Sequence, residues 1–366
     1  MGRNPRIRLG ILFGGRSGEH EVSLTSAASV IRALDPAEFE ITAMGVSRSG
    51  KLVSSDEVRR MLPANVQDRI VPQNPLDAAG SRLRLSASAA DPLDPSSPPD
   101  VIFPLMHGPY GEDGTIQGLL EIAGLAYIGC GVLASAVGMD KVVMKRLFQQ
   151  AGLPTLPYRD VLSRDLKGNL DELRRSIEES FDYPMFSKPA NLGSSVGVRK
   201  IHGPGEFTEA ILNAAQYDRK ILIEKGINAR ELECAVLGND EPLASTVGEV
   251  IPGHEFYDYD AKYNDPSSRL DIPARLSDEQ TEEIRRLSVA AFKAIDGAGL
   301  SRVDFFIDRD TGKVWLNEIN TMPGFTPISM YTKLWAASGI PFNELMHRLV
   351  DLGLERHAET TARRIS

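Results

Sequence analysis

Apolar runs of strand length alternate with helical patterns in the first third of the chain. Residues 6–13 and 39–46 are such runs, with a glycine turn and a helical pattern between them. Residues 101–105 form another buried strand, and a helix is predicted at 115–123. Because parallel neighbouring strands need a crossover helix between them, this order predicts a doubly wound parallel sheet.

The middle of the chain changes to shorter elements. A helix that ends near residue 151 is followed by helices near 168–180 and 205–216 and by strands at 185–188 and 220–224. This alternation predicts a small α+β domain.

The last third is predicted to be a larger α+β unit. Strands are expected at 231–237 and 245–251, and the capping box that begins at Ser277 precedes a helix with apolar residues at helical spacing. Strands at 301–308 and 313–319 flank a turn and predict a β-hairpin.

The length of 366 residues is too great for one core and fits two or three domains. We place them at 1–140, 141–225 and 226–366. Residues 71–100, rich in Pro, Ser, Ala and Asp, are interpreted as a surface insertion. The polar, aromatic loop 252–272 is interpreted as a lid. With 42% hydrophobic and 25% charged residues, the composition excludes a wholly disordered chain.

Charge narrows the classes of partner. Lys and Arg number 41 and Asp and Glu 50, a net charge of −9 that repels phosphate backbones and anionic lipid surfaces. We therefore expect neither nucleic acid nor a membrane as a partner. No apolar run is long enough to span a bilayer and the start lacks a signal core, so we expect a cytoplasmic protein. Cys130 and Cys234 are too few for a disulfide framework and are expected in the core.

The predicted hairpin carries the sharpest chemical signal. Arg302 and Asp304 alternate on one strand, and Glu318 and Asn320 alternate on the other. If even-numbered residues pair with even-numbered ones, all four side chains share a face. Two carboxylates and an amide oxygen suit Mg²⁺ bound together with substrate phosphates. The alternative is a solvated polar face with an Arg–Asp pair.

A second candidate is the loop from Lys188 to Val198, which follows a strand and offers a lysine, hydroxyls and flexible backbone. Such a loop can cover phosphate oxygens, although a simple Gly-Ser connection is the alternative. It lacks the Walker spacing, and the glycines after the first strand lack the Gly-x-Gly-x-x-Gly spacing of a dinucleotide site.

Acidic residues and one histidine complete the candidates. Glu224 ends a buried strand, and Glu231 and Glu233 follow in another, where they could bind ribose hydroxyls and a purine amino group. The alternative is an edge strand with a wet face. His107 and Glu112 are either acid–base groups or a structural hydrogen-bonded pair, and the sequence favours the structural role.

In this order the segments resemble the ATP-grasp superfamily and, within it, the D-alanine:D-alanine ligases. Five motifs carry the resemblance and cover almost the whole chain. They are 14–23 (GGRSGEHEVS), the His107 loop, 188–198 (KPANLGSSVGV), 256–263 (FYDYDAKY) and 317–324 (NEINTMPG). The long segment 71–99 and the charged tail after residue 355 depart from the family pattern.

The resemblance implies an ATP-grasp fold and an ATP-dependent ligase that works through an acyl phosphate. One D-alanine carboxylate attacks the γ-phosphate of ATP, and the amine of a second D-alanine displaces phosphate to give D-alanyl-D-alanine for peptidoglycan synthesis. Positioning and charge stabilisation in a water-excluded cleft would drive such a reaction. The resemblance also implies a homodimer formed through the amino-terminal domain.

The resemblance implies a role for each candidate. Two Mg²⁺ ions, with Mn²⁺ as a substitute, would bind Asp304, Glu318 and Asn320. The ATP-binding set would be Lys141, Lys188, Ser195, Glu224, Lys225, Glu231 and Lys262. Arg302 and the Gly324 amide would form the oxyanion site. Glu19, Ser194 and Tyr263 would form a network around the first D-alanine, and His107 and Ser329 would contact substrate.

Three alternatives compete with this interpretation. A related ligase could make D-alanyl-D-lactate or D-alanyl-D-serine. Relatives that make D-alanyl-D-lactate depart from the sequence 258–263, so the resemblance favours an amine over the D-lactate hydroxyl as the nucleophile. A nucleotide-dependent oxidoreductase lacks its glycine fingerprint. A catalytically inactive ATP-binding module has no need of Lys188, Asp304, Glu318 and Asn320 together.

Overall fold

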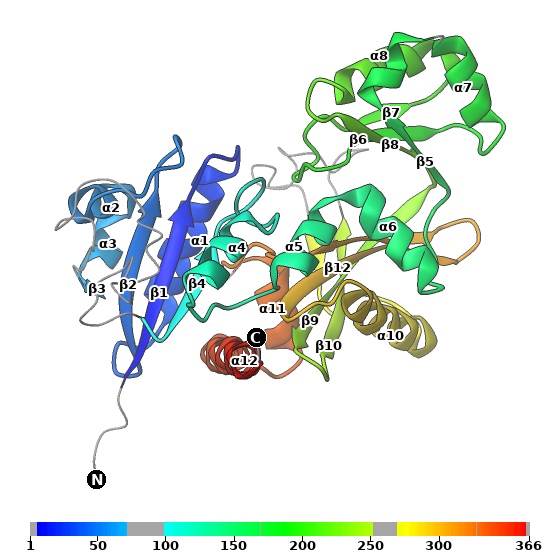
Figure 1. Ribbon diagram of the computed structural model, residues 1–366. Helices are drawn as coiled ribbons and strands as arrows, with labels where there is room; N and C mark the ends of the chain where they lie inside the picture. Colours follow the sequence, from blue (N-terminus) through cyan, green and yellow to red (C-terminus); the bar gives the residue numbers. More distant parts are fainter. Residues whose placement is uncertain (1–5, 72–98, 169, 252–268, 327, 364–366) are drawn as a thin grey trace.

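The computed structural model describes residues 6–71, 99–168, 170–251, 269–326 and 328–363. Three sheets make up this part of the chain (Figure 1). Their strands fall within residues 1–140, 141–225 and 226–366, one sheet in each range.

The amino-terminal sheet is parallel, as the sequence predicts. Its order is β3 (Ile70–Val71), β2 (Phe39–Val46), β1 (Ile7–Gly14) and β4 (Val101–Leu105). Helix α1 (His20–Ala33) packs on one face, and Leu120 of α4 (Thr115–Ile122) packs with apolar residues of the other. The short helices α2 (Ser55–Met61) and α3 (Ala64–Gln67) lie at the β2 side (Figure 1).

The central sheet is small and antiparallel. Its order is β5 (Tyr158–Leu162), β8 (Lys220–Lys225), β6 (Met185–Pro189) and β7 (Arg199–Ile201). Helices α7 (Leu170–Glu178) and α8 (Pro204–Ala214) cover its outer face and close a separate core (Figure 1). A 3₁₀ helix, η2 (Ser163–Lys167), follows β5.

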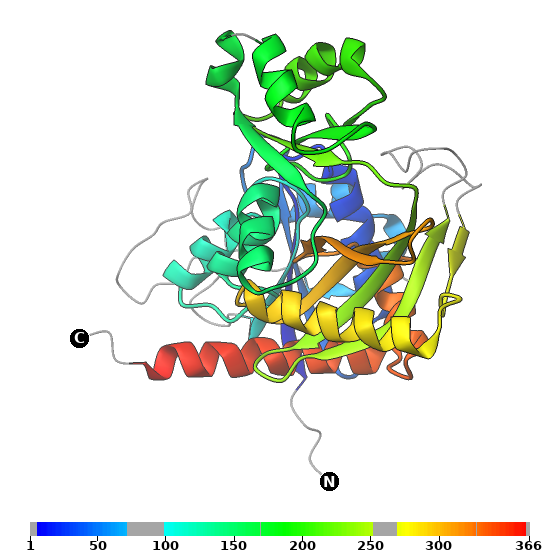
Figure 2. The same cartoon turned by 90° about the vertical axis from the view of Figure 1, so that its right-hand side faces the viewer.

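The third sheet is antiparallel and larger. Its order is β11 (Arg269–Asp271), β10 (Leu243–Ile251), β9 (Ala229–Gly238), β12 (Gly299–Asp308) and β13 (Val314–Asn320). Residues of α5 (Val132–Met139), α6 (Lys141–Gln150) and α10 (Asp278–Ala294) share a core with one face. Helices α11 (Met330–Ala337) and α12 (Phe342–Ala362) join the other face to the amino-terminal sheet in one continuous core. Figure 2 shows α12 running along the base of the molecule.

Most predicted elements agree with the structure to within a few residues. Ser277 caps α10, since its hydroxyl accepts from the Gln280 amide at 3.2 Å. Cys130 and Cys234 are buried and unpaired with each other, as expected. Among the described helices, none has the length and apolar character to cross a membrane.

One interpretation of the sequence was wrong, and two others concern segments that the structure describes only in part. The edge-strand alternative for residues 231–237 is wrong, because β9 lies between β10 and β12 and both of its neighbours are hydrogen-bonded. Within the predicted lid loop, 269–271 form the edge strand β11, which pairs with β10. The rest of that loop, 252–268, and most of the predicted insertion, 72–98, lie outside the described residues.

Candidate active site

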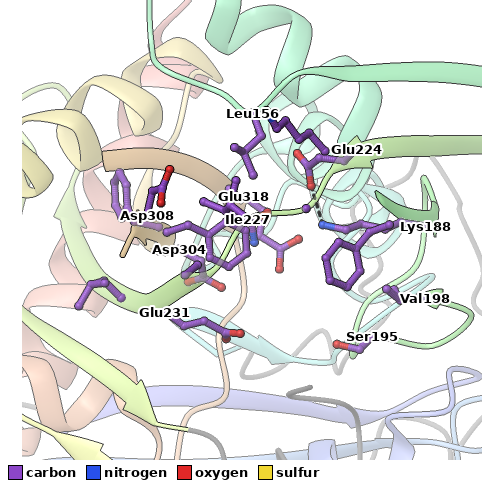
Figure 3. A pocket seen from close by; sticks show the side chains of 18 of the residues that line it. Leu156, Lys188, Ser195, Val198, Glu224, Ile227, Glu231, Asp304, Asp308 and Glu318 are labelled. Carbon is purple, nitrogen blue, oxygen red and sulfur yellow. Dashed lines mark hydrogen bonds and ion pairs between the residues drawn. The ribbon is translucent and has the colours of Figure 1, made fainter. Parts of the chain in front are cut away.

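A cavity of about 900 Å³ lies between the central sheet and the third sheet (Figure 3). Strands β6 and β8, the loop 190–198 and strands β9, β12 and β13 line it. The predicted site residues that line it are Lys141, Lys188, Ser194, Ser195, Glu224, Lys225, Glu231, Asp304 and Glu318.

The hairpin register brings the predicted polar face together. Arg302 pairs with Asn320 and Asp304 pairs with Glu318, so even-numbered residues oppose even-numbered ones. The four side chains therefore share one face of the sheet, while Val303 lies in the core on the other. The even-to-even pairing that the sequence required for the oxygen donors to converge is therefore present.

A β-bulge in β13 lets this strand keep polar residues on the cavity face and apolar residues on the core face. Beyond the Asp304–Glu318 pair the register shifts, and Phe305 opposes Leu316, which leaves Asn317 as the extra residue. Without the bulge, Leu316 would share the face of Glu318. The bulge lets β13 bury Leu316 and Ile319 while Glu318 faces the cavity.

Arg302 lies among carboxylates. Its guanidinium donates to both Asp304 oxygens at 2.7 Å and lies 3.0 Å from Glu233 Oε2. Burial opposes the charge of Arg302, but these carboxylates and Glu318 outweigh burial and hold its pKa well above the ordinary value. The Arg–Asp pair expected under the solvated-face alternative exists, but it is largely buried, with side chains 17% and 14% exposed.

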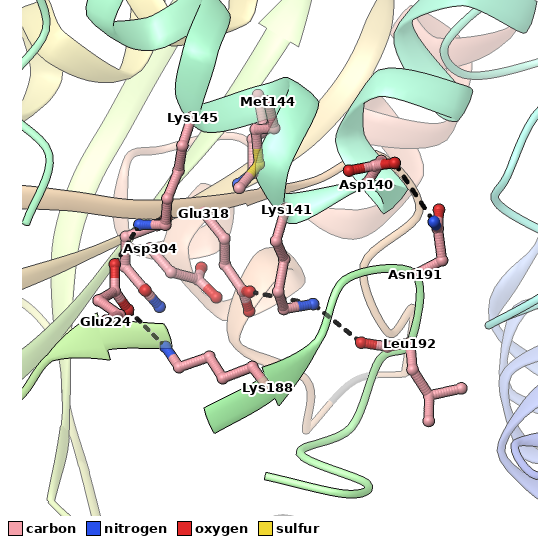
Figure 4. Close-up of polar contacts among 12 residues, drawn as sticks. Asp140, Lys141, Met144, Lys145, Lys188, Asn191, Leu192, Glu224, Asp304 and Glu318 are labelled. Carbon is pink, nitrogen blue, oxygen red and sulfur yellow. Dashed lines mark hydrogen bonds and ion pairs between the residues drawn. The ribbon is translucent and has the colours of Figure 1, made fainter. Parts of the chain in front are cut away.

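Glu224 holds two lysines (Figure 4). Its Oε1 lies 2.6 Å from Lys145 Nζ, and its Oε2 accepts from Lys188 Nζ at 2.7 Å. Burial opposes ionisation of Glu224, but the two ammonium groups outweigh it and lower the pKa of the carboxyl. Lys145 also donates to the Asn317 carbonyl at 3.0 Å.

Lys141 begins α6 and lines both this cavity and a smaller one beside it. Its Nζ donates to the Leu192 carbonyl at 2.8 Å and lies 3.7 Å from Glu318 Oε2. The side chain thus connects the loop after β6 to the hairpin. The same loop is tied at its base by Asn191, whose amide donates to Asp218 at 2.8 Å.

The smaller cavity, about 100 Å³, adjoins the first. Both cavities share Lys141, Gly193, Ser194 and Glu318. The predicted residues that line the smaller one also include Glu19, His107, Arg302, Asn320 and Gly324.

Ser194 joins two parts of the molecule at this smaller cavity. Its hydroxyl donates to Glu19 Oε1 at 2.5 Å, so the loop after β6 contacts the loop before α1. Ser194 and Ser195 both have positive φ, 52° and 57°, a strained conformation for side-chain-bearing residues that recurs at functional sites.

His107 and Glu112 are buried and structural, but they are not the mutual pair that the sequence suggested. His107 contacts the Met322 carbonyl and the Ser26 hydroxyl, and burial lowers its pKa although Glu19 opposes the shift. Glu112 accepts from the Gly108 amide at 3.0 Å. Burial and the Glu19 carboxylate raise the pKa of Glu112 to about 8.

Ser329 lines neither cavity. It precedes α11, where its hydroxyl contacts Thr326, and a Cβ on Gly324 would come within 3.2 Å of it. Ser329 is thus a neighbour of the Gly324 turn. Lys262 and Tyr263 lie outside the described residues.

The sequence interpretation missed Lys145 and gave Glu233 a different role. Lys145 is 1% exposed and stands in the buried stripe of α6 with Val142 and Phe148, at a spacing of three. A lysine inside an apolar helical stripe was the available signal. Glu233, interpreted as a ribose ligand, contacts Arg302 across adjacent strands.

The donor set fits a hard divalent cation that also binds phosphate oxygens. Among the residues described, no group of three His, Cys, Asp or Glu side chains could hold a metal ion. Asp304 and Glu318 are two adjacent carboxylates, and the Asn320 amide oxygen is oriented by the Met322 amide at 3.0 Å. Two carboxylates and an amide leave positions for water and phosphate, as Mg²⁺ requires.

Two family models match the chain. The model described as D-ala D-ala ligase N-terminus matches residues 8–130, and that described as D-ala D-ala ligase C-terminus matches residues 147–351. Together they cover most of the residues that line the two cavities, and Lys141 lies between the two matched ranges.

Curated relatives match over nearly the full length. A D-alanine–D-alanine ligase of Acetivibrio thermocellus is 48% identical, over 98% of this chain and 98% of its own. One of Heliobacterium modesticaldum is 50% identical, over 96% and 95%.

Solved structures share the fold. The D-alanine-D-alanine ligase of Coxiella burnetii superposes with a TM-score of 0.80 at 34% identity, over 97% of this chain and 96% of that one. The VanG D-Ala:D-Ser ligase of Enterococcus faecalis gives 0.80 at 32% identity, over 95% and 100%.

Proposed function

The chain belongs to the D-alanine–D-alanine ligase family, and we propose that the two adjoining cavities carry out its ATP-dependent ligation. The protein is an ATP-grasp ligase that forms D-alanyl-D-alanine for peptidoglycan synthesis. In this reaction a D-alanine carboxylate takes the γ-phosphoryl group, and the amine of a second D-alanine displaces phosphate. The remaining question is which side chains of this chain perform each task.

The observation that supports the assignment most is the register of the β12–β13 hairpin. It aligns Arg302, Asp304, Glu318 and Asn320 on one face, and that face borders both the large and the small cavity. A nucleotide in the large cavity would direct its γ-phosphate to the junction, where a carboxylate in the small cavity could reach it.

We assign the nucleotide to the large cavity. Lys188 and Lys141 supply positive charge for phosphate oxygens, and Ser195 supplies a hydroxyl in the loop between them. Glu224, Lys225 and Glu231 line the same cavity and are assigned to the adenosine part. Lys262 joins this set through the family resemblance alone.

We assign Mg²⁺ to Asp304, Glu318 and Asn320, with two ions and replacement by Mn²⁺ as part of the proposal. When bound, the metal neutralises charge on the transferring phosphoryl group. Each Asp304 oxygen accepts one bond from Arg302, and a carboxylate has about four acceptor positions in all. Lys141 lies 3.7 Å from Glu318 and keeps a positive charge next to that carboxylate.

Arg302 and the Gly324 amide are assigned to the oxyanion of the tetrahedral intermediate. Both line the small cavity. The carboxylates around Arg302 fix its guanidinium before the reaction, so no reorganisation is needed as charge develops. Ser329, beside Gly324, is assigned to the carboxylate of the second D-alanine.

Glu19 is assigned to the ammonium group of the first D-alanine. Ser194 orients its carboxylate through the 2.5 Å hydrogen bond, and Tyr263 joins them by family resemblance. His107, held between Met322 and Ser26, supports the wall of the same cavity.

Phosphate release tests the proposal directly. ATP and Mg²⁺ are supplied with D-alanine or with L-alanine, and free phosphate is measured. We expect release with D-alanine and background release with L-alanine. Equal release with both, or none with either, would reject the proposed function.

A second candidate product is suggested by the likeness to a D-Ala:D-Ser ligase at 32% identity. Release is therefore compared with D-alanine, D-serine and D-lactate as second substrates at a fixed concentration of D-alanine. Faster turnover with D-serine would favour that alternative. A homodimer and a cytoplasmic location complete the proposal, and sedimentation of the purified chain tests the first.

A further inference from the structure

Lys145 is buried, charged and absent from the lining of both cavities. It lies four residues after Lys141 on α6, so both lysines point to the same side of the helix. Lys141 reaches the cavity itself, whereas Lys145 ends on Glu224 and on the Asn317 carbonyl. Its hydrogen-bonded contacts toward the site are therefore these two groups, and its charge also acts on Glu318 directly.

The contact with Asn317 fixes the β-bulge. Asn317 is the residue of β13 without a partner in the register, and it directly precedes Glu318. Lys145 Nζ donates to its carbonyl at 3.0 Å, and the Ile319 amide donates to Met144 Sδ at 3.4 Å. Helix α6 thus holds the bulge on both sides of Glu318.

The contact of Lys145 with Glu224 connects it to Lys188, the lysine assigned to the phosphates. Glu224 Oε2 accepts from Lys188 Nζ, which lines the large cavity (Figure 4). Lys145, Glu224 and Lys188 place two cations around one carboxylate, so positive charge remains on the cavity side. A chain of contacts runs from Lys188 through Glu224 and Lys145 to the Asn317 carbonyl, in the peptide group directly before Glu318.

We propose that Lys145 is a positioning residue that couples the nucleotide-binding lysine Lys188 to the metal-binding carboxylate Glu318. This inference rests on the proposed function, because it names a further residue for the same site. Lys145 holds the bulge that orients Glu318 toward the cavity. It also shares the carboxylate of Glu224 with Lys188. Nucleotide and metal therefore bind better together than their separate affinities predict.

Replacement of Lys145 by Met tests the coupling without a large charge penalty. Met keeps the length of the side chain, and Glu224 retains Lys188 as a one-to-one partner. Calorimetry measures ADP affinity with and without Mg²⁺, a readout independent of turnover. We expect the Mg²⁺-dependent gain in affinity to fall about 10- to 100-fold, the range typical for groups that orient metal ligands.

Kinetics of the variant give a second readout. The Mg²⁺ concentration for half-maximal phosphate release and the KM for ATP should rise, while the KM for D-alanine stays within about twofold of wild type. Arg356→Met is the matched control, because Arg356 is also largely buried, at 18% exposed, and contacts Tyr127 and Glu121. It should leave the Mg²⁺ dependence unchanged.

An unchanged Mg²⁺ gain in folded Lys145→Met protein would overturn the coupling, even if its Tm is lower. If Lys145→Met does not fold, Lys145→Gln is measured, which keeps a donor for the Asn317 carbonyl and removes the charge beside Glu224. A smaller fall in the Mg²⁺ gain is then expected, because only the Glu224 contact is weakened, and a wild-type value would overturn the proposal. Wild-type protein that binds no ADP would reject the proposed function itself, a different result from either.

Discussion

Two buried ionic clusters of opposite character lie side by side at the nucleotide cavity (Figure 4). Around Glu224, two ammonium groups share one carboxylate. Around Arg302, one guanidinium lies among the carboxylates of Glu233, Asp304 and Glu318. The first cluster has excess positive charge and suits phosphate oxygens, and the second has excess negative charge and suits a cation. Bound magnesium nucleotide would balance both clusters at once.

The largest effect is expected where the negative cluster meets the metal. Glu318→Gln keeps the shape of the side chain but removes its negative charge as a metal ligand. It should lower kcat by at least about 10³-fold, because metal stabilisation of the transferring phosphoryl group is worth several kcal/mol. Its far-UV circular dichroism and Tm should stay close to wild type. Near-normal turnover at low Mg²⁺ would exclude Glu318 as a metal ligand.

A change in the positive cluster should affect stability rather than chemistry alone. Glu224→Gln leaves Lys145 and Lys188 buried without their shared counter-ion, which typically costs about 3–5 kcal/mol. Urea unfolding at pH 7 measures this loss. Lys145→Met is the matched comparison, because it leaves a balanced pair and should cost clearly less.

The same carboxylate predicts a pH dependence. The folded-state pKa of Glu224 lies below its ordinary value of 4.5, so its stabilising contribution is complete above pH 4.5. That contribution is lost as the pH falls through the folded-state value. The difference in unfolding free energy between wild type and Glu224→Gln should therefore shrink on acidification. A difference that grows below pH 4.5 would contradict the lowered pKa.

A variant of Arg302 tests whether the negative cluster acts in catalysis or only in structure. Arg302→Lys keeps a charge near Glu233 and Asp304 but loses the planar, two-pronged donor. We expect kcat to fall about 10²- to 10³-fold, or about 3–4 kcal/mol, as for the loss of one oxyanion donor. Stopped assays of phosphate release measure it. A fall in Tm with kcat unchanged would assign Arg302 to structure only.

The sequence predicted the negative cluster better than the positive one. Alternation along β12 put Arg302 and Asp304 on one face and Val303 on the other, and a hairpin joins neighbouring residues in a register that short-range rules describe. The bulge was not predicted, although apolar residues at 314, 316 and 319 break the alternation and carry its signal.

The positive cluster depends on contacts between segments far apart in the chain. Glu224 lies on β8 and Lys145 on α6, and no local pattern states that they meet. The strand and the family resemblance both place Glu224 among the adenosine ligands, whereas its two lysine partners appear only in the packed structure. Glu233 shows the same limit, since its contact with Arg302 requires β9 and β12 to be neighbours.

The smallest effect is expected at Ser194, which lies where the two cavities meet. Ser194→Ala removes the hydrogen bond to Glu19, and a bond to a charged group contributes about 1.5–3 kcal/mol. Both ionic clusters stay intact, so the KM for the first D-alanine should rise about 10- to 100-fold while ADP affinity and Tm remain near wild type. Ser195→Ala is the control from the same loop, because Ser195 lines only the nucleotide cavity. A rise in the KM for ATP in Ser194→Ala, with that for D-alanine unchanged, would move Ser194 to the nucleotide side.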